Sequence, residues 1–217
     1  MDEFAKVRRR MVKRQIAARG VRDPRVLDAM ARVPRHVFVP EALAPHAYDD
    51  CPLPIGHGQT ISQPYIVARM TEMLELDGSE RVLEIGAGCG YQTAVLATLA
   101  REVCALELEE GLVSSARETL EEHGFGSIDL RQGDGFTRWP GGGDFDAILC
   151  ACAPDAIPPV LTAQLGAGGR LVLPVGRHDG PQMLHRVRRA ADDHLEVSRE
   201  EAVRFVPMRR PSSRGVG

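Results

Sequence analysis

From residue 81 onward, short apolar runs alternate with amphipathic stretches. The apolar runs predict parallel strands that are buried on both faces, and the stretches between them predict helices. We expect strands at 82–85, 102–106, 128–132, 147–152 and 170–175, and helices at 91–100, 112–123 and 158–165. Two final segments, 182–189 and 194–205, alternate apolar and polar residues and predict an antiparallel pair. The pattern predicts a doubly wound α/β sheet with helices on both faces, mostly parallel, with an antiparallel C-terminal pair.

Before this repeat, an amphipathic helix is predicted over residues 4–16, because Phe4, Val7 and Met11 recur at helical spacing. Its other side is basic, a pattern that also occurs on helices that meet nucleic acid or a membrane surface. We interpret it as a solvated face over a packed apolar stripe. Gly20 ends this helix, and Asp23 is placed to cap a second one over 24–31.

A proline-rich segment follows, with prolines at 34, 40, 45, 52, 54 and 64. This density excludes long helices and predicts an ordered, folded-over loop, which in a compact enzyme is often a lid or a binding wall. The loop ends in residues 58–64, immediately before a helix predicted over 65–76. Ser62 lies three residues before that helix, so its hydroxyl either caps the helix or serves the chemistry of a site, and the sequence leaves both open.

The central feature is the turn between the first predicted strand and the next helix. Gly86, Gly88 and Gly90 permit backbone angles and close approaches that a Cβ would prevent. Free N–H groups at the helix start then point at a ligand held beyond the strand. The third glycine comes one place too early for a dinucleotide fingerprint. Glu84 adds a carboxylate that can reach the cationic end of an amino-acid-like ligand. The alternative is that this is a Rossmann-like turn that binds another nucleotide.

Two further strand ends carry acids. Glu107 closes the second predicted strand, where a carboxylate can accept hydrogen bonds from both hydroxyls of a ribose. Asp134 and Gly135 follow the third, where an acid can accept from an adenine amino group and a backbone N–H can reach a ring nitrogen. The alternatives are an exposed strand-end acid for Glu107 and a simple tight turn for Asp134. Together, these residues indicate a nucleotide-binding site more strongly than any one of them does, because three strand ends meet at one crevice.

Composition narrows the class of protein. The chain has 217 residues, of which 43% are hydrophobic, and this is enough for one α/β domain. Its net charge of −3 and pI near 6.2 do not indicate a protein that binds polyanions in general. Five cysteines form no C-x-x-C pair and seven histidines show no ligand spacing, so we expect no metal. Cys150 and Cys152 should face one side of a strand as small buried residues. We find no membrane span or signal peptide and expect a cytoplasmic protein.

Six motifs occur in an order that resembles the protein-L-isoaspartate O-methyltransferases, a Rossmann-like family that uses S-adenosyl-L-methionine. The motifs are RVPRHVFVP at 32–40, GQTISQP at 58–64, VLEIGAGCGY at 82–91, GDG at 133–135, GGRLVLPVG at 168–176 and VRFVP at 203–207. The similarity runs from residue 6 to residue 208. It implies one methyltransferase domain over 1–208, with N-terminal helices and a substrate-side loop over 1–64 and a Rossmann-like core over 65–208. Residues 209–217 are predicted to be an unstructured tail.

The resemblance also assigns residues. Ser62 matches the catalytic serine of the family. The cofactor set implied for S-adenosyl-L-methionine is Gln59, Thr60, Ile61, Ser62, Glu84, Gly86, Ala87, Gly88, Glu107, Leu108, Asp134 and Gly135. The substrate set implied is Ser62, Gln63, Val203, Phe205 and Val206. There are departures from the family pattern. Cys89 replaces a usual serine or threonine, and the segment 150–154, on the strand that borders the site, replaces a Thr-Ala-Ala-Pro type.

The activity that the resemblance implies is methyl transfer to the α-carboxylate of an isoaspartyl residue in a protein or peptide. The ester then closes to a succinimide, which starts repair. A carboxylate with a pKa of about 4 is already ionised at pH 7, so the reaction needs alignment of the reactants and no proton removal. The rivals are a methyltransferase for another carboxylate, such as aspartate of a dedicated peptide, a non-catalytic cofactor-binding homologue, and a nicotinamide oxidoreductase. We expect a monomer that binds neither nucleic acid nor membrane.

Overall fold

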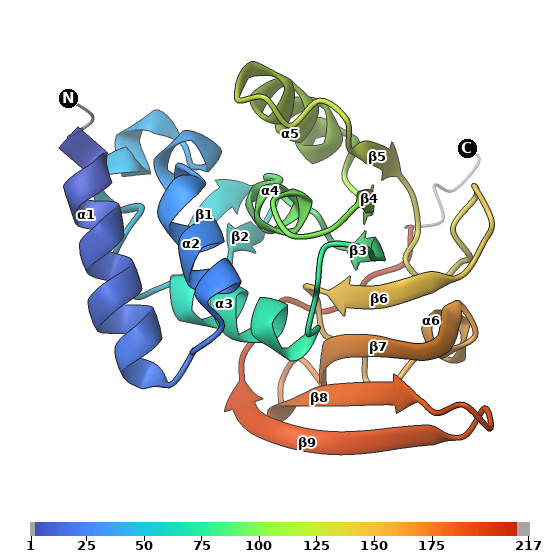
Figure 1. Ribbon diagram of the computed structural model, residues 1–217. Coiled ribbons are helices and arrows are strands. Elements are labelled where there is room, and N and C mark those ends of the chain that lie inside the picture. Colours follow the sequence, from blue (N-terminus) through green and yellow to red (C-terminus); the bar gives the residue numbers. More distant parts are fainter. Residues whose placement is uncertain (1–2, 212–217) are drawn as a thin grey trace, which may run out of the picture.

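The computed structural model describes residues 3–211 and shows a seven-stranded sheet with helices on both sides (Figure 1). The strands are β3 (Arg81–Ile85), β4 (Glu102–Glu107), β5 (Asp129–Gln132), β6 (Phe145–Cys150), β7 (Leu165–Val175), β8 (Gln182–Arg189) and β9 (Leu195–Val203). Their spatial order is β5-β4-β3-β6-β7-β8-β9. The first five run parallel, and β8 and β9 are antiparallel. The predicted doubly wound fold with an antiparallel C-terminal pair is confirmed.

The strand order reverses at β3, which pairs with β4 on one side and β6 on the other. All but the first residue of β3 are buried, because both faces of the sheet are covered. Val82 packs in a cluster with residues of helix α3 (Pro64–Met73), whereas Leu83 on the opposite face packs with Leu161 of helix α6 (Pro159–Thr162). In doubly wound sheets, ligands bind outside the carboxyl ends of the strands at such a reversal. The crevice is therefore expected beside Gly86.

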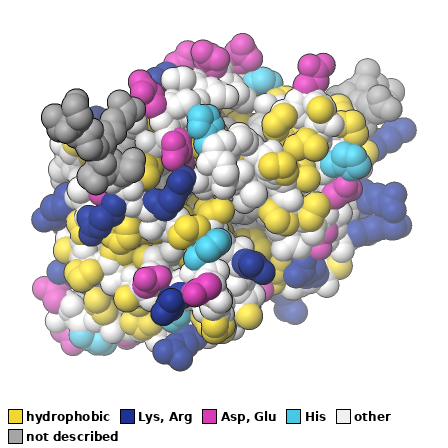
Figure 2. Space-filling view, turned by 180° about the vertical axis from the view of Figure 1, so that it is seen from behind, with side chains coloured by type: hydrophobic (Ala, Val, Ile, Leu, Met, Phe, Trp, Pro, Cys, Tyr) yellow, Lys and Arg dark blue, Asp and Glu magenta, His cyan; other side chains and the backbone are white. Residues whose placement is uncertain are grey.

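Six α-helices are assigned in the described chain. They are α1 (Glu3–Met11), α2 (Pro24–Arg32), α3 (Pro64–Met73), α4 (Tyr91–Ala97), α5 (Glu110–Glu122) and α6 (Pro159–Thr162). The predicted helix over 4–16 is α-helical to Met11 and continues as a π turn over Val12–Ile16. Gly20, with φ +102°, ends this segment, and Asp23 caps α2 by accepting from the Arg25 backbone N–H at 2.8 Å. Lysine and arginine side chains gather at the edge that carries α1 (Figure 2).

Two strand predictions need correction. The strand predicted over 170–175 is β7, which already begins at Leu165 and includes the glycines at 166, 168 and 169. Gly168 has φ +75°, and the pairing register with β6 shifts here, so the glycines form an irregularity within the strand. The strand predicted over 147–152 is β6, which ends at Cys150. Cys152 thus lies beyond the strand, although its Sγ is 3.6 Å from that of Cys150.

The proline-rich segment folds into short helical turns and a hairpin of β1 (Leu53–Gly56) and β2 (Gln59–Ile61). It is fixed to the domain by Arg35, which is fully buried and donates from Nε to the Ala47 carbonyl at 2.7 Å. The Arg35 guanidinium also lies 5.0 Å from the ring centre of Tyr91, the first residue of α4. This contact holds the helical turns before the hairpin against the start of α4.

Candidate active site

The glycine turn is tied to the neighbouring strand. Gly86, Gly88 and Gly90 all have positive φ, at 84°, 56° and 87°. The backbone N–H groups of Gly86 and Ala87 both donate to the Leu106 carbonyl, at 2.8 and 3.1 Å. A Cβ on Gly88 would lie 3.2 Å from Ile55 of the hairpin. The turn therefore has its shape because glycine stands at these positions, and the hairpin lies directly against it.

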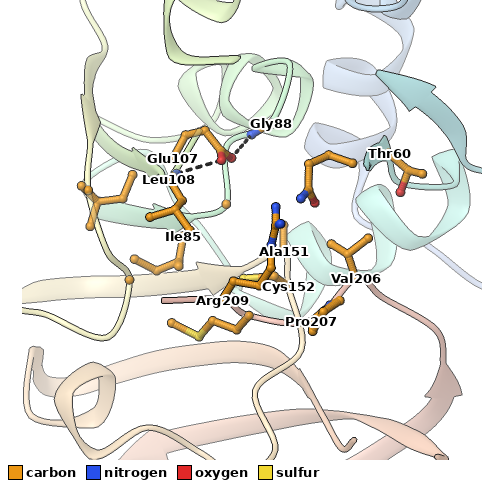
Figure 3. A pocket seen from close by; sticks show the side chains of 16 residues that line it. Thr60, Ile85, Gly88, Glu107, Leu108, Ala151, Cys152, Val206, Pro207 and Arg209 are labelled. Carbon is orange, nitrogen blue, oxygen red and sulfur yellow. Dashed lines mark hydrogen bonds between the residues drawn. The ribbon is translucent and has the colours of Figure 1, made fainter. Parts of the chain in front are cut away.

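The side chain of Glu107, at the end of β4, organises the same region. Its carboxylate accepts from the backbone N–H groups of Gly88 and Leu108, each at 2.8 Å (Figure 3). It also accepts from the backbone N–H of Glu109 at 3.0 Å. Glu107 is 7% exposed, so the exposed strand-end acid considered from the sequence is not what the structure shows. Oε1 accepts two of these bonds and Oε2 accepts one, so Oε2 can still receive a ligand hydroxyl.

A pocket lies between the ends of β3 and β4 and the hairpin (Figure 3). Seven of the predicted cofactor residues line it, namely Gln59, Thr60, Gly86, Gly88, Glu107, Leu108 and Gly135. The sequence analysis missed other lining residues, among them Cys152, Met208 and Arg209. Arg209 bonds Glu109 at 2.9 Å, and it belongs to the predicted tail, where no motif marked it. Residues 212–217 of that tail lie outside the described chain.

Asp134 does not line this pocket in the structure. Its Oδ1 accepts the backbone N–H of Phe136 at 2.8 Å, and its Oδ2 lies 3.7 Å from Arg210 Nη1. The tight-turn interpretation therefore describes what this side chain does here. The adjacent Gly135 is packed closely, because a Cβ there would lie 2.3 Å from Ile85 Cγ2.

Glu84 is wholly buried in the middle of the sheet. Neither of its carboxylate oxygens has a hydrogen-bond partner, and neither does the buried hydroxyl of Thr93 on α4. Burial raises the pKa of Glu84 to about 8, although the nearby Thr93 hydroxyl opposes the rise, and the negative charge of Glu107 adds a smaller increase. Buried polar groups are normally paired, so an unpaired carboxylate beside a cavity indicates a missing ligand. The small cavity that Glu84 lines is also lined by Ile61, Ser62 and Ala87.

Ser62 joins this inner cavity to a larger groove of about 590 Å³ on the other side of the hairpin. All five predicted substrate residues line the groove, namely Ser62, Gln63, Val203, Phe205 and Val206. The residue that precedes α3 in the capping position is Gln63, and no side chain caps the helix. The helix-cap alternative for Ser62 is therefore wrong, and its hydroxyl lies at the junction of two cavities.

The groove wall after β9 is held rigidly. The Gln182 side chain accepts the Phe205 backbone N–H at 2.6 Å and donates to its carbonyl at 3.2 Å. The Ala153 backbone N–H donates to the Val206 carbonyl at 2.8 Å. The groove also contains Arg19, His178 and Arg204, which the sequence analysis did not single out.

Comparison with known proteins identifies the family. A family model described as protein-L-isoaspartate(D-aspartate) O-methyltransferase matches residues 6–213. This chain belongs to that family. Protein-L-isoaspartate O-methyltransferase 1 of Rhodopseudomonas palustris is 53% identical over 205 residues, which are 94% of this chain and 84% of the relative. The protein-L-isoaspartate O-methyltransferase of Syntrophus aciditrophicus is 53% identical over 211 residues, 96% of each chain.

A solved structure supports the fold. A protein-L-isoaspartate O-methyltransferase of Plasmodium falciparum, in complex with S-adenosyl-L-homocysteine, superposes with a TM-score of 0.81 over 93% of this chain and 98% of that one, at 22% identity. The predicted family, enzyme class and Rossmann-like fold are confirmed. Within residues 3–211, no group of three or more metal-ligating side chains is found, and no helix is long and apolar enough to span a membrane.

Proposed function

We propose that this chain carries out the reaction of its family, methyl transfer from S-adenosyl-L-methionine to the α-carboxylate of isoaspartyl residues, at the junction marked by Ser62. The observation that carries the proposal is that Ser62 lines both the inner cavity and the groove. The inner cavity and the adjoining pocket hold the donor, and the groove holds the polypeptide. The methyl ester then closes to a succinimide, which begins repair of the damaged residue.

The residues present fit a sulfonium donor with an amino-acid end. Glu84 supplies an unpaired buried carboxylate for the cationic amino group, and Thr93 supplies a second unpaired polar atom. Glu107 lies where a ribose would be bound, with acceptor capacity remaining on Oε2, which accepts only the Gly88 N–H. When bound, the donor supplies an electrophilic methyl group. Ile61, Ala87 and Gly88 line the space that the protein offers it.

The acceptor side needs alignment and no base. A carboxylate is ionised at neutral pH, so no proton has to be removed before attack. Ser62 donates a hydrogen bond that fixes one carboxylate oxygen and leaves the other facing the inner cavity. The rigid segment Val203–Val206 supplies backbone groups along which the peptide lies. Holding the reactants in line can account for a large part of the rate, since effective molarities reach ~10⁵–10⁸ M.

The departure at Cys150 and Cys152 concerns the donor side. Cys152 lines the pocket below the glycine turn and does not line the groove, whose nearest lining residue on this loop is Ala151. A cysteine in place of the family's usual small residue therefore alters the wall of the donor pocket. It does not alter the wall of the groove that is proposed to hold the peptide. This favours the general isoaspartyl substrate over a dedicated one.

The test is transfer of labelled methyl to a synthetic isoaspartyl peptide, compared with the same peptide that contains ordinary aspartate. We expect label on the isoaspartyl peptide only, released as methanol in mild base. Equal labelling of both peptides would favour a methyltransferase for another carboxylate. Donor binding without any label transfer would favour a non-catalytic homologue.

The organisation of the chain is part of the proposal. We assign residues 1–208 to one methyltransferase domain, in which 1–64 supply the N-terminal helices and the substrate-side loop. A monomer, a cytoplasmic location and the absence of nucleic-acid binding remain predictions from the sequence. Size-exclusion chromatography with light scattering tests the first of these directly.

A further inference from the structure

The groove beside Ser62 is charged, and its charges are not equally compensated. Four ionisable side chains line it, namely Arg19, His178, Glu201 and Arg204. Arg19 bonds Asp50 at 3.0 Å, and its guanidinium lies 3.6 Å from the ring centre of Tyr65. Its charge is therefore largely neutralised where it stands.

Glu201 is compensated in the same way. Its carboxylate lies 3.5 Å from Arg69 Nε and 3.4 Å from the Tyr65 hydroxyl. Arg204, by contrast, is exposed and has no hydrogen-bond or ion-pair partner within residues 3–211. Among the arginines and glutamates of the groove, Arg204 therefore carries the charge that is free to meet a ligand.

The backbone fixes where this charge stands. Phe205 is buried at 8% exposure and is held through both its N–H and its carbonyl by Gln182. Arg204 directly follows β9, which ends at Val203, and its neighbours Phe205 and Val206 line the groove together with it. A cation on a long side chain thus projects from a rigid support beside the proposed peptide path.

We infer that Arg204 makes this enzyme favour isoaspartyl sites that have an acidic residue close by in the polypeptide. The inference rests on the proposed function, because it names the kind of peptide that the same groove takes. An exposed ion pair contributes modestly, so the preference expected for a glutamate over a glutamine neighbour is about two- to fivefold in kcat/KM. It decreases as salt is added, since exposed charges are screened.

The experiment uses capped isoaspartyl peptides of one length, with Glu, Gln or Lys placed in turn at each of the two positions on either side of the isoaspartyl residue. The unmodified enzyme is expected to rank Glu above Gln above Lys at one or more positions. Arg204→Gln removes the ranking, and Arg204→Glu reverses it. The ratio between peptides is measured within each variant, so a general loss of folded enzyme does not affect the outcome.

Arg188→Glu is the matched control. Arg188 is an exposed arginine on β8, in the same sheet, and does not line the groove, so the ranking should persist in this variant. A ranking that survives in Arg204→Gln, or equal rates for the three peptides with the unmodified enzyme, overturns the inference and leaves the proposed function standing. Failure to methylate even the glutamine-flanked isoaspartyl peptide overturns the proposed function itself.

Discussion

The carboxylate of Glu107 accepts a hydrogen bond from the backbone N–H of Gly88 at 2.8 Å. This bond joins the end of β4 to the glycine turn that follows β3. The same carboxylate also holds the N–H groups of Leu108 and Glu109. One side chain therefore shapes both the turn and the strand end between which the donor is proposed to bind, before any ligand arrives.

Replacing Glu107 should affect donor binding and stability together. In Glu107→Gln one oxygen becomes an NH₂ group, which faces backbone donors and cannot accept from them. Charge-assisted hydrogen bonds contribute about 1.5–3 kcal/mol each, so we expect donor affinity to fall at least about tenfold. Calorimetric titration with S-adenosyl-L-homocysteine and thermal unfolding measure the two effects.

Glu102→Gln on the same strand is the control for this variant. Glu102 is exposed and pairs with Arg81 at 2.7 Å. An exposed pair contributes at most about 1 kcal/mol, and Glu102 does not line the pocket, so ligand affinity should not change. Similar ligand affinities in the two variants would contradict the role given to Glu107.

The pKa of Glu84 predicts how the ligand-free protein responds to pH. Its folded pKa, about 8, lies above the ordinary value near 4.5. The neutral carboxyl therefore stabilises the fold fully below about pH 4.5, and this contribution is lost as the pH rises to about 8. We expect the free energy of unfolding to decrease over this range, and to decrease less in Glu84→Gln. Denaturation at pH 5, 6, 7 and 8 measures the difference between the two proteins.

Donor binding should be linked to the same proton. If the ionised form of Glu84 pairs with the amino group of the donor, binding at pH 7 releases protons from the neutral carboxyl. Calorimetry in buffers of different ionisation enthalpy should then show a buffer-dependent binding enthalpy. Glu84→Gln should bind weakly and lose this dependence. Enthalpies independent of buffer in the unmodified enzyme would exclude the linkage.

Ser62→Ala separates chemistry from donor binding. The hydroxyl lies at the junction of the two cavities and caps no helix, so its removal should leave the fold unchanged. We expect turnover of an isoaspartyl peptide to fall strongly while affinity for S-adenosyl-L-homocysteine stays nearly intact. Ser115→Ala, at an exposed position on α5, is the control. Parallel loss of turnover and affinity would mean that Ser62 has a structural role.

Gly135 should tolerate no side chain. A Cβ there would lie 2.3 Å from Ile85 Cγ2 and 2.8 Å from Met208 Cε, so both would have to move. Gly135→Ala is expected to lower the unfolding midpoint by several degrees, since overpacking costs about 1–3 kcal/mol, and to weaken donor binding. At Gly126 the nearest atom to an added Cβ is 3.8 Å away, so Gly126→Ala should leave both quantities almost unchanged. Equal effects of the two substitutions would argue against close packing at Gly135.

The sequence was most informative where a residue type is required by backbone geometry. The glycines at 86, 88 and 90 all adopt positive φ, and Glu107 closes its strand beside them, because neighbouring parallel strands end at one edge. The side chain partners of Asp134 and the charge left free on Arg204 could not be predicted. Both depend on which segments meet in three dimensions, and Arg210, which faces Asp134, lay in a stretch without any pattern.

The hairpin that carries Thr60 contacts the pocket, the inner cavity and the groove, whereas the opposite groove wall comes from Val203 to Val206. The two walls are thus far apart in the sequence and meet only through the folded sheet. A chain in which β9 has not yet docked has its glycine turn but only half of a cleft for a polypeptide. Peptide binding therefore requires that the edge of the sheet at β9 is in place.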